Sequence, residues 1–579
     1  MWKYVRKYLY FAIPAALFMV GEVSMDLLQP GLMRRIVDEG VLRLDAAGAG
    51  GLDLIFTLGL TMVGLVLFGG MCGSLNNMFA HLASQNIGNE IRKDCFRRIM
   101  CFSFPQMDRF GTGSLVTRVT NDITQIQNFV AQFIRGMIRT TMLVAGSIFC
   151  MFRLNRQFGL MLLCAFPLLA GCMAVCLYKA GPLLPRLQEQ LDEINSVMQE
   201  DVAGIRVIKA CVRETYETIR FGKANDALVG TQLWVLVIFA FMNPVMNALM
   251  YIVVVLLLLS GSVQVGAGTT TPGAVMAAIT YTTQMLNGIL NLVMLFQTLT
   301  KGAASWKRVR EILDTQPELA DGDFEGKTAA GAGVEFRDVS FGFPGAGQTV
   351  LRHIDLTIRP GETVAVMGAT GCGKTALVSL IPRFYDVTEG AVLVDGVDVR
   401  AWRQRALRDR VAVAAQKSEL FSRTIGENIA WGAPGAPEDA LRTAAVTAQA
   451  DGFISAAPEG YGTMVAEGGA SLSGGQKQRI SIARAVLKPA GILIFDDSTS
   501  ALDLKTEADL YAALKAAKPE TTKIIVAQRI ASVRQADRIV VLRDGRIDAC
   551  GTHEELLASC KTYQDIYHSQ IGEEEESHG

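Results

Sequence analysis

Long apolar runs fill most of the first half of the chain, whereas the second half alternates short apolar and polar stretches. A bilayer requires roughly 20 apolar residues per helix, and segments of that length lie at about 8–29, 54–80, 131–152, 157–178, 232–262 and 274–299. They predict six membrane spans, with both ends of this half on one side. Lys and Arg gather before the first span and after the second and fourth, and the loop at 263–272 has neither, so we expect a cytoplasmic N-terminus.

Helical patterning continues beyond two of the spans. No proline occurs from Leu54 to Phe102, which predicts one helix of ~75 Å against a hydrocarbon core of ~30 Å. A similar extension runs from Leu187 to Val212, before span five. We therefore expect two arms that project into the cytoplasm and can transmit the movement of a domain there.

Two carboxylates interrupt the first span. Glu22 and Asp26 lie four residues apart and so share one helical face. A charge near the bilayer centre costs at least ~2.5 kcal/mol, so such residues pair with a cation or face a cavity. One interpretation is structural, with Arg34 and Arg35 drawn toward them or the carboxylates hydrated at the outer boundary. The other is that they line the outward part of a pathway and favour cationic amphiphiles.

Neutral polar residues occur in the last two predicted spans. They either bond neighbouring helices or line an aqueous pathway, and the sequence leaves both interpretations open. In span six they are spaced near one helical face, and in span five they flank Pro244. The residues are Thr280, Gln284, Asn287 and Asn291 in span six and Asn243 and Asn247 in span five.

Composition supports a membrane protein with more than one domain. The 579 residues, 50% hydrophobic and 19% charged, exceed what one compact core accommodates. A formal net charge of -1 gives no reason to expect a nucleic-acid partner. The eleven cysteines, which include no CxxC pair, are typical of small buried side chains rather than of disulfides or a metal site. The N-terminus lacks a small-residue cleavage site, so we interpret it as a retained span rather than a signal peptide.

The composition changes after residue 313 and predicts the domain boundaries. A polar passage rich in Gly and Ala follows, and then short apolar strands alternate with helical stretches. We expect a transmembrane domain over 1–313, a linker over 314–332, an α/β domain over 333–570 and an acidic, disordered tail over 571–579.

A glycine-rich stretch stands between an apolar strand at 363–367 and an apolar helix start at 376–381. This order of strand, turn and helix is what a phosphate-binding loop requires. Backbone N–H groups would point at phosphate oxygens, Lys374 would neutralise the phosphates and the Thr375 hydroxyl would coordinate Mg²⁺. The residues expected to bind phosphate are Gly368, Ala369, Thr370, Gly371, Cys372, Gly373, Lys374, Thr375 and Ala376.

Further motifs follow in a fixed order: Leu472-Ser-Gly-Gly-Gln476, the strand Ile492-Leu-Ile-Phe-Asp496 and Ser500-Ala-Leu-Asp503. The segments Asp108–Asp122 and Glu200–Lys209 stand where coupling helices would lie. Over essentially its whole length the chain resembles ATP-binding cassette (ABC) exporters. The resemblance implies a six-span α-helical domain followed by an α/β P-loop domain, ATP and Mg²⁺ as cofactors, and a place in the bacterial plasma membrane with the N-terminus and nucleotide-binding domain in the cytoplasm.

The resemblance also assigns roles to single residues. Phe343 would stack on adenine, where the family usually has tyrosine. Gln416 would reach Mg²⁺ and the attacking water, and Asp496 would supply a Mg²⁺ carboxylate. Asp503 would contact the other subunit. Residues of the signature would close over ATP held by the opposite subunit, from a helix N-terminus; these are Ser473, Gly474, Gly475 and Gln476.

Two positions depart from the family pattern in one ATP site. Asp497 stands where a glutamate polarises water, and the shorter side chain withdraws the carboxylate by roughly 1.5 Å. A general base must lie within about 2.6–3.2 Å of its proton, and misplacement by ~1 Å can cost ~10²-fold in rate. Gln528 replaces the usual histidine and cannot carry its positive charge. These changes should slow hydrolysis and spare ATP binding.

The single cassette implies a half-transporter that must dimerise. We favour a heterodimeric exporter of a hydrophobic or amphiphilic substrate, in which this chain binds ATP at a degenerate site and its signature completes the hydrolytic site of a non-identical partner. Membrane lipids would surround it. Two alternatives stay open: a slow homodimeric exporter in which Asp497 and Gln528 still work, and a nucleotide-gated regulatory membrane subunit.

Overall fold

The computed structural model describes residues 1–42, 49–326, 332–345 and 347–577. Contacts between residues divide the chain into two compact units. Met1–Met100 and Gly113–Thr315 form the first, and Cys101–Thr112 joins the chain from Gln316 onward in the second.

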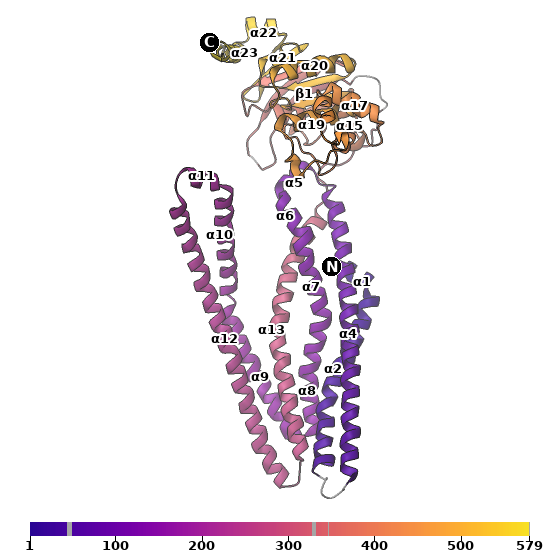
Figure 1. Cartoon of the computed structure of the whole chain (residues 1–579), viewed down its shortest axis with the longest axis vertical. Helices are drawn as coiled ribbons and strands as arrows, with labels where there is room; N and C mark the ends of the chain where they lie inside the picture. The colour runs from indigo at the N-terminus through magenta and orange to yellow at the C-terminus, as the bar shows by residue number, and fades with distance from the viewer. Residues whose placement is uncertain (43–48, 327–331, 346, 578–579) are drawn as a thin grey trace. The chain divides into compact units, whose positions relative to one another are not determined.

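The described part of the first unit is helical (Figure 1). Its elements are α1 Trp2–Lys7, α2 Leu9–Arg35, η1 Ile36–Val41, α4 Ala49–Ile99, α6 Thr112–Thr117, η2 Arg118–Asp122, α7 Ile123–Gln132, η3 Phe133–Met137, α8 Ile138–Leu154, α9 Arg156–Ala180, α10 Leu183–Ala203, α11 Ile205–Ala210, α12 Glu214–Gly266 and α13 Pro272–Asp314. The prediction of one unbroken helix from Leu54 to Phe102 is nearly matched, because α4 runs for 51 residues. After span four, α10 packs along α12.

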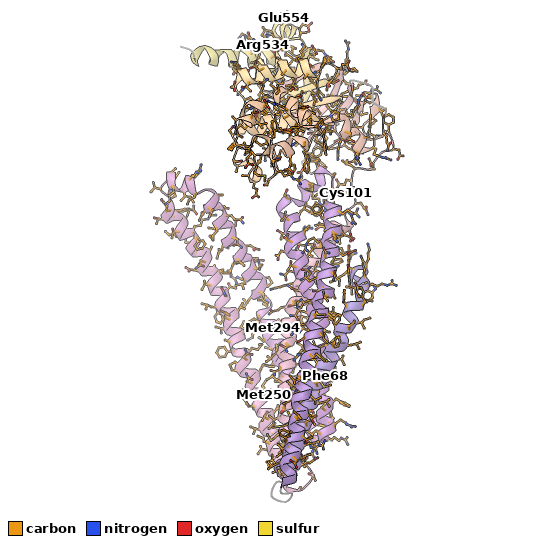
Figure 2. The ribbon with its side chains drawn as sticks, turned by 45° about the vertical axis from the view of Figure 1, so that its right-hand side comes forward. Phe68, Cys101, Met250, Met294, Arg534 and Glu554 are labelled. Carbon is orange, nitrogen blue, oxygen red and sulfur yellow. The ribbon has the colours of Figure 1, made fainter. Side chains whose placement is uncertain are left out.

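Five stretches are long and apolar enough to cross a membrane, among the residues that the structure describes. They are Leu9–Val41, Gly51–Ile99, Thr112–Leu154, Arg156–Ala203 and Glu214–Gly266. Helix α13, expected as the sixth span, is not one of them, since polar residues such as Gln284 and Asn287 lower its hydropathy. Phe68 on α4 and Met294 on α13 (Figure 2) are 48% and 73% exposed, as side chains that meet lipid would be.

The two carboxylates of the first span form ion pairs with an arginine that the sequence did not indicate. Arg139 on α8 pairs with Glu22 and, at 3.4 Å, with Asp26. The predicted partners are wrong: Arg34 pairs with Asp38 and Arg35 with Glu39, each four residues further along the same segment. Residues four positions apart are neighbours on a helix, so Arg34 and Arg35 reach these carboxylates without any contact between helices.

Three of the six polar residues singled out in the last two spans donate hydrogen bonds to backbone oxygens, and one of these bonds joins two helices. Gln284 donates from Nε2 to the backbone oxygen of Asp26 at 3.0 Å and so joins α13 to α2. Thr280 and Asn247 donate to carbonyl oxygens of their own helices. The bond of Gln284 supports the interpretation of contact between helices, whereas those of Thr280 and Asn247 favour neither interpretation.

The two predicted turn segments contain short helices. The first lies earlier than expected: α5 spans Phe104–Phe110, because Ser103 and Gln106 form a capping box and Gly111, with φ of 70°, ends the helix. The structure groups α5 with the second unit, where the Phe104 ring lies 4.5 Å from that of Phe384. In the other segment Gly204 separates α10 from α11.

Two sheets form the framework of the second unit. A six-stranded sheet has the order β10-β9-β3-β8-β7-β6, and a four-stranded antiparallel sheet has the order β2-β1-β4-β5. Strands β9, β3, β8, β7 and β6 run parallel, so their carboxyl ends share one edge. The strands are β1 Val334–Phe341, β2 Leu351–Ile358, β3 Thr363–Gly368, β4 Glu389–Val394, β5 Val397–Asp398, β6 Val411–Ala414, β7 Ile492–Asp496, β8 Thr522–Val526, β9 Arg538–Arg543 and β10 Arg546–Gly551.

The second unit also contains helices, some of which bury the continuous apolar strands of the parallel sheet, such as β7, while others pack mainly on neighbouring helices. They are α14 Lys374–Ser379, α15 Gln404–Arg410, α16 Ile425–Ala430, α17 Glu438–Thr447, α18 Asp451–Ser455, η4 Gly460–Gly462, η5 Glu467–Gly469, α19 Gly474–Leu487, α20 Leu504–Ala517, α21 Ile530–Val533, α22 His553–Ser559 and α23 Lys561–Ser577.

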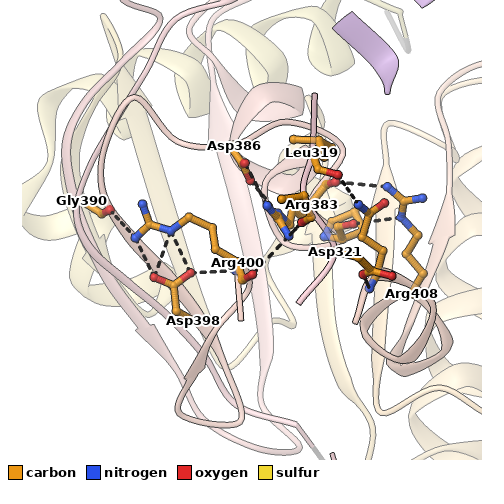
Figure 3. Close-up of polar contacts among 11 residues, drawn as sticks. Leu319, Asp321, Arg383, Asp386, Gly390, Asp398, Arg400 and Arg408 are labelled. Atoms are coloured by element: carbon orange, nitrogen blue, oxygen red, sulfur yellow. Dashed lines mark hydrogen bonds and ion pairs between the residues drawn. The ribbon is translucent and has the colours of Figure 1, made fainter. Parts of the chain in front are cut away.

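The described part of the predicted linker is held by polar contacts (Figure 3). The buried Arg383 forms a bidentate ion pair with Asp386 at 2.6 and 3.0 Å and donates to the backbone oxygen of Ala320 at 2.9 Å. Gln404 donates to the Leu319 oxygen at 3.1 Å. Residues 327–331 of the predicted linker lie outside the described residues. The polar composition of 316–326 therefore reflects docking by hydrogen bonds.

The predicted tail begins inside a helix. Helix α23 continues to Ser577, whereas disorder was expected from residue 571. Glutamate has a high helix propensity, which allows the helix to extend through Glu573–Glu576. Residues 578–579 lie outside the described part of the chain.

Candidate nucleotide-binding and catalytic site

The predicted phosphate-binding loop connects β3 to α14. Its glycines adopt positive φ angles, 83° at Gly371 and 103° at Gly373. A Cβ at Gly368 would lie 2.2 Å from the carbonyl oxygen of Leu542, so only glycine fits there. Ala369, Thr370 and Gly371 are exposed at the loop tip, while Cys372 and Ala376 are buried beneath it. The loop thus presents backbone rather than side chains.

Lys374 lies over this loop. Its ammonium donates to the carbonyl oxygens of Gly368 at 2.8 Å and Ala369 at 2.9 Å. Both acceptors belong to the loop itself, so the charge is held at the loop that would receive a phosphate group. This position fits the predicted role of Lys374.

Thr375 and Asp496 meet at the carboxyl edge of the sheet. The Thr375 hydroxyl donates to Oδ1 of Asp496 at 3.0 Å. Burial raises the pKa of the Asp496 carboxyl, and the hydrogen bond from Thr375 opposes that shift. A hydroxyl and a carboxylate side by side offer the oxygen ligands that Mg²⁺ prefers, so Thr375 and Asp496 fit this ion.

Asp497 accepts hydrogen bonds from the other two predicted catalytic residues, Gln416 and Gln528. Gln528 donates from Nε2 to Asp497 Oδ2 at 3.0 Å, and Gln416 donates to the same oxygen at 3.4 Å. Asp497 has a left-handed backbone, with φ of 47°, and its N–H donates to the Val526 oxygen at 3.0 Å. This backbone conformation is uncommon for a residue other than glycine.

The four strands that carry these residues are neighbours. Strand β3 leads into the loop, β7 ends at Asp496, and Gln416 and Gln528 follow β6 and β8. Parallel strands place their carboxyl ends at one edge, and ligands bind there in α/β sheets. Residues up to 160 positions apart in sequence therefore converge.

The signature segment forms a helix start. Ser473 caps α19: its backbone N–H donates to Oε1 of Gln476 at 2.9 Å, and the Gln476 N–H donates to the Ser473 hydroxyl at 3.3 Å. A Cβ at Gly475 would lie 3.0 Å from the carbonyl oxygen of Ala501, and one at Gly474 would lie 3.7 Å from the Ala501 Cβ. Small residues thus let the segment that ends at Asp503 pack behind the signature.

Asp503 caps the next helix, α20. It accepts from the Thr506 N–H at 2.9 Å and from the Thr506 hydroxyl at 2.7 Å. These hydrogen bonds lower the pKa of the Asp503 carboxyl. The hydrogen bonds of Ser473 and Gln476 described above stay within the signature segment, and those of Lys374 stay within the phosphate-binding loop.

Phe343 is 38% exposed beside two other rings. Its ring meets those of Phe341 and Tyr385 edge to face, with centroids 5.0 and 5.3 Å away. The partial exposure of this ring is compatible with its predicted stacking on adenine.

Sequence reasoning missed three residues that support the site. Tyr385 holds Phe343, and Gln478 donates to the Ser500 hydroxyl at 3.2 Å and accepts from the Ala501 N–H at 2.9 Å. Gln570 on α23 donates to the Gln528 oxygen at 2.7 Å and accepts from the Ile530 N–H at 2.8 Å. Gln478 lies two residues past the signature, and this proximity was a weak indication that it supports the site. Nothing near Gln570 in the sequence indicated the site.

Comparison with known proteins gives a consistent result. The family profile described as "ABC transporter transmembrane region" matches residues 15–289, and the one described as "ABC transporter" matches residues 351–500. The uncharacterized ABC transporter ATP-binding protein YfiB of Bacillus subtilis is 37% identical over 572 residues, which cover 99% of this chain and 98% of that protein.

Two further relatives are described by what they do. An ATP-dependent lipid A-core flippase of Syntrophus aciditrophicus is 34% identical over 523 residues, 90% of this chain and 87% of that protein. The solved structure of a bacterial Atm1-family ABC exporter with ATP bound matches with a TM-score of 0.79 at 25% identity and 98% coverage of both chains. The chain belongs to the ABC transporter family and is an ATP-hydrolysing exporter of the plasma membrane with its nucleotide-binding domain in the cytoplasm.

Proposed function

We propose that this chain is the degenerate-site subunit of a heterodimeric exporter. The observation that carries the proposal is the bond from Gln528 to Asp497 Oδ2, the oxygen that also faces Gln416. A carboxylate that accepts a proton from water needs a free lone pair aimed at that water. Two amide donors use this oxygen, and neither can supply the positive charge of an imidazolium at the γ-phosphate.

The proposal also assigns a full set of nucleotide-binding groups to this chain. The loop backbone, Lys374 and Phe343 would hold the phosphates and the base. Thr375, Asp496 and Gln416 would hold Mg²⁺, which when bound neutralises charge on the β- and γ-phosphates. The site thus has the parts for binding ATP and weakened parts for cleaving it.

The signature supplies the second half of the proposal. Ser473 and Gln476 fix the start of α19, whose first N–H groups can face an anion. In a dimer this end would face ATP on the partner and complete the partner's hydrolytic site. A non-identical partner with its own catalytic glutamate would then perform most of the hydrolysis.

The membrane half would provide six spans, with α13 as the sixth. An amphiphilic or hydrophobic substrate is favoured by the large apolar helical bundle and by relatives named as lipid A-core flippases. The domain limits proposed from the sequence, 1–313 for the membrane part and 333–570 for the nucleotide-binding part, fit this division of labour.

The test is the ATPase activity of the chain purified alone, with its oligomeric state verified. We expect retention of Mg²⁺–ATP and little or no turnover. The control is the same preparation with Asp497→Glu and Gln528→His, which restores the usual pair of groups. Robust turnover by a verified homodimer of the natural chain would replace the proposal with a slow homodimeric exporter.

A further inference from the structure

Glu507 on α20 is a buried carboxylate outside the groups assigned above to nucleotide and Mg²⁺. One of its oxygens, Oε1, accepts from the Thr499 hydroxyl at 2.5 Å and from the Ser532 hydroxyl at 2.6 Å. These lengths are typical of hydroxyl groups that donate to an ionised carboxylate. All three residues are buried, so the bonds form away from bulk water. A single oxygen therefore joins two segments that are distant in sequence.

The two segments joined by Glu507 carry two of the predicted catalytic residues. Thr499 lies two residues after Asp497, in the loop between β7 and α20. Ser532 lies four residues after Gln528, in α21, which follows β8. Glu507 bonds to both segments from a third element, α20. A shift of either segment away from α20 would break one of these bonds and change the distance from Gln528 to Asp497.

Arg529 makes a second set of contacts between the same two segments. It directly follows Gln528, and its guanidinium lies 3.8 Å from Oε2 of Glu507. It also donates to the backbone oxygens of Leu502 at 3.0 Å and Ser500 at 3.3 Å, both in the loop after β7. The carboxylate thus accepts from both segments on one oxygen and faces a cation of the second segment on the other.

The buried charge of Glu507 favours a role other than filling space. Moving a carboxylate out of water is costly, and well-packed apolar side chains in place of buried charges are often neutral or stabilising. An apolar side chain would fill the space between α20 and α21, but it would not orient the two hydroxyl groups. Hydrogen bonds are directional, and a satisfied buried network specifies one arrangement of the segments that it joins.

We propose that Glu507 is a positioning residue for ATP hydrolysis. It holds the loop after β7 and the segment after β8 at a fixed separation, so that the side chains at positions 497 and 528 keep their contact at the edge of the sheet. Accurate placement matters there, because misplacement by ~1 Å can cost ~10²-fold in rate. The proposal goes beyond the degenerate-site subunit and does not rest on it, since the same two segments carry whichever residues occupy these positions.

The test follows hydrogen exchange of the full chain in detergent, without nucleotide, by mass spectrometry of the segments 498–503 and 529–534. Thr499→Val and Ser532→Ala each remove one hydroxyl donor and change the side-chain shape little. Thr499→Ser and Ser532→Thr retain the hydroxyl. Because exchange requires no turnover, this measurement can succeed or fail independently of the degenerate-site proposal.

We expect each hydroxyl removal to speed exchange about tenfold in both segments, as the loss of one bond to a charged group would. The effect on the segment that does not contain the substitution is the informative one, because only a link through Glu507 carries it there. The two removals combined should have less than the sum of their separate effects. Thr499→Ser and Ser532→Thr should keep the slow exchange of the natural chain.

Tyr461→Phe is the matched control for these variants. It removes a hydroxyl that donates to the Asp451 carboxylate at 2.7 Å elsewhere in the same unit. Exchange in the segments 498–503 and 529–534 should not change in this variant. The same acceleration in Tyr461→Phe would show a general loosening of the unit and overturn the proposal.

ATP cleavage and ATP binding are then measured separately. Single-turnover cleavage, with protein in excess over ATP so that slow hydrolysis is detected, should slow about tenfold in Glu507→Ala and in Thr499→Val. Affinity for Mg²⁺–ATP should stay unchanged, because Lys374 and the phosphate-binding loop are untouched. General destabilisation would weaken binding as well, so this difference between cleavage and binding identifies positioning. Thr499→Val answers the question if Glu507→Ala does not fold.

Three further results would overturn the proposal. Faster exchange confined to the substituted segment would show that Glu507 does not link the two segments. Equal exchange in Thr499→Ser and Thr499→Val would show that the hydroxyl is not the group that matters. Unchanged cleavage in a variant whose two segments both exchange faster would assign Glu507 to stability alone.

Discussion

The Gln528 amide donates to Oδ2 of Asp497 at 3.0 Å, so the two positions expected from the sequence to differ from the family pattern contact each other. Taken separately, Asp497 and Gln528 could each be interpreted as a substitution that leaves hydrolysis intact. In contact they form one unit, in which an amide holds the carboxylate that would have to act on water. Restoring only one member leaves the other mismatched.

The first prediction concerns the catalytic pair. Asp497→Glu alone should raise hydrolysis less than Asp497→Glu with Gln528→His, since the reach of the base and the charge of the switch residue act on one transition state. The double variant should gain roughly 10²-fold, the cost of a misplaced base. Steady-state ATPase assays in the proposed heterodimer, with the partner's own site disabled, measure this gain. Equal rates for both variants would disprove the coupling.

The second prediction concerns the signature. Ser473→Arg or Gly474→Asp places a bulky or negative side chain at the start of α19. Either change should reduce the ATPase activity of the complex by about 10²-fold or more, the loss that follows removal of one catalytic donor group. Lys374→Ala should instead impair nucleotide retention at the site proposed to be degenerate. Turnover and bound nucleotide are measured for both. Wild-type turnover with a disrupted signature would contradict a composite site.

The third prediction concerns Gln570, whose two hydrogen bonds hold the segment from Gln528 to Ile530. Gln570→Ala should lower the free energy of local opening of this segment by about 1–2 kcal/mol, as expected for two hydrogen bonds. Hydrogen exchange of the Ile530 amide reports this opening. Gln564→Ala is the matched control, because Gln564 lies on the same helix and bonds to Leu557. Unchanged exchange in Gln570→Ala, or the same change in both variants, would show that the two hydrogen bonds of Gln570 do not hold this segment.

The fourth prediction concerns the ion cluster of Arg139, Glu22 and Asp26. Arg139→Gln should destabilise the protein by about 2 kcal/mol or more, because it leaves two carboxylates unpaired in the membrane. The triple variant with Glu22→Gln and Asp26→Asn should recover most of this loss. Thermal unfolding in detergent measures both. No recovery would show that the charges do more than balance one another.

A transport assay then separates the two interpretations of these carboxylates. Matched cationic and neutral substrates are compared in the wild type and in Glu22→Gln/Asp26→Asn. A selective loss of the cationic substrate would place the cluster in the pathway. An equal loss, or none, leaves it a structural role.

The sequence alone determined those features that depend on short-range pattern. Strand, glycine turn and helix around Lys374 follow from local composition, as do the buried strand that ends at Asp496 and the capped start of α19 at Ser473. Hydropathy likewise indicated the long α4, because an uninterrupted helix requires only its own residues. Motif order was sufficient for the family and for most of the proposed site.

Tertiary structure decided which side chains meet across large separations. The contact of Gln528 with Asp497 depends on β7 and β8 being neighbours. The hydrogen bonds of Gln570 depend on the packing of α23 next to the segment that follows β8. The pairing of Arg139 with Glu22 and Asp26, instead of Arg34 and Arg35, required α8 to pack against α2. Hydropathy and motif spacing describe each segment separately, whereas these contacts arise only when the folded chain brings distant segments to one place.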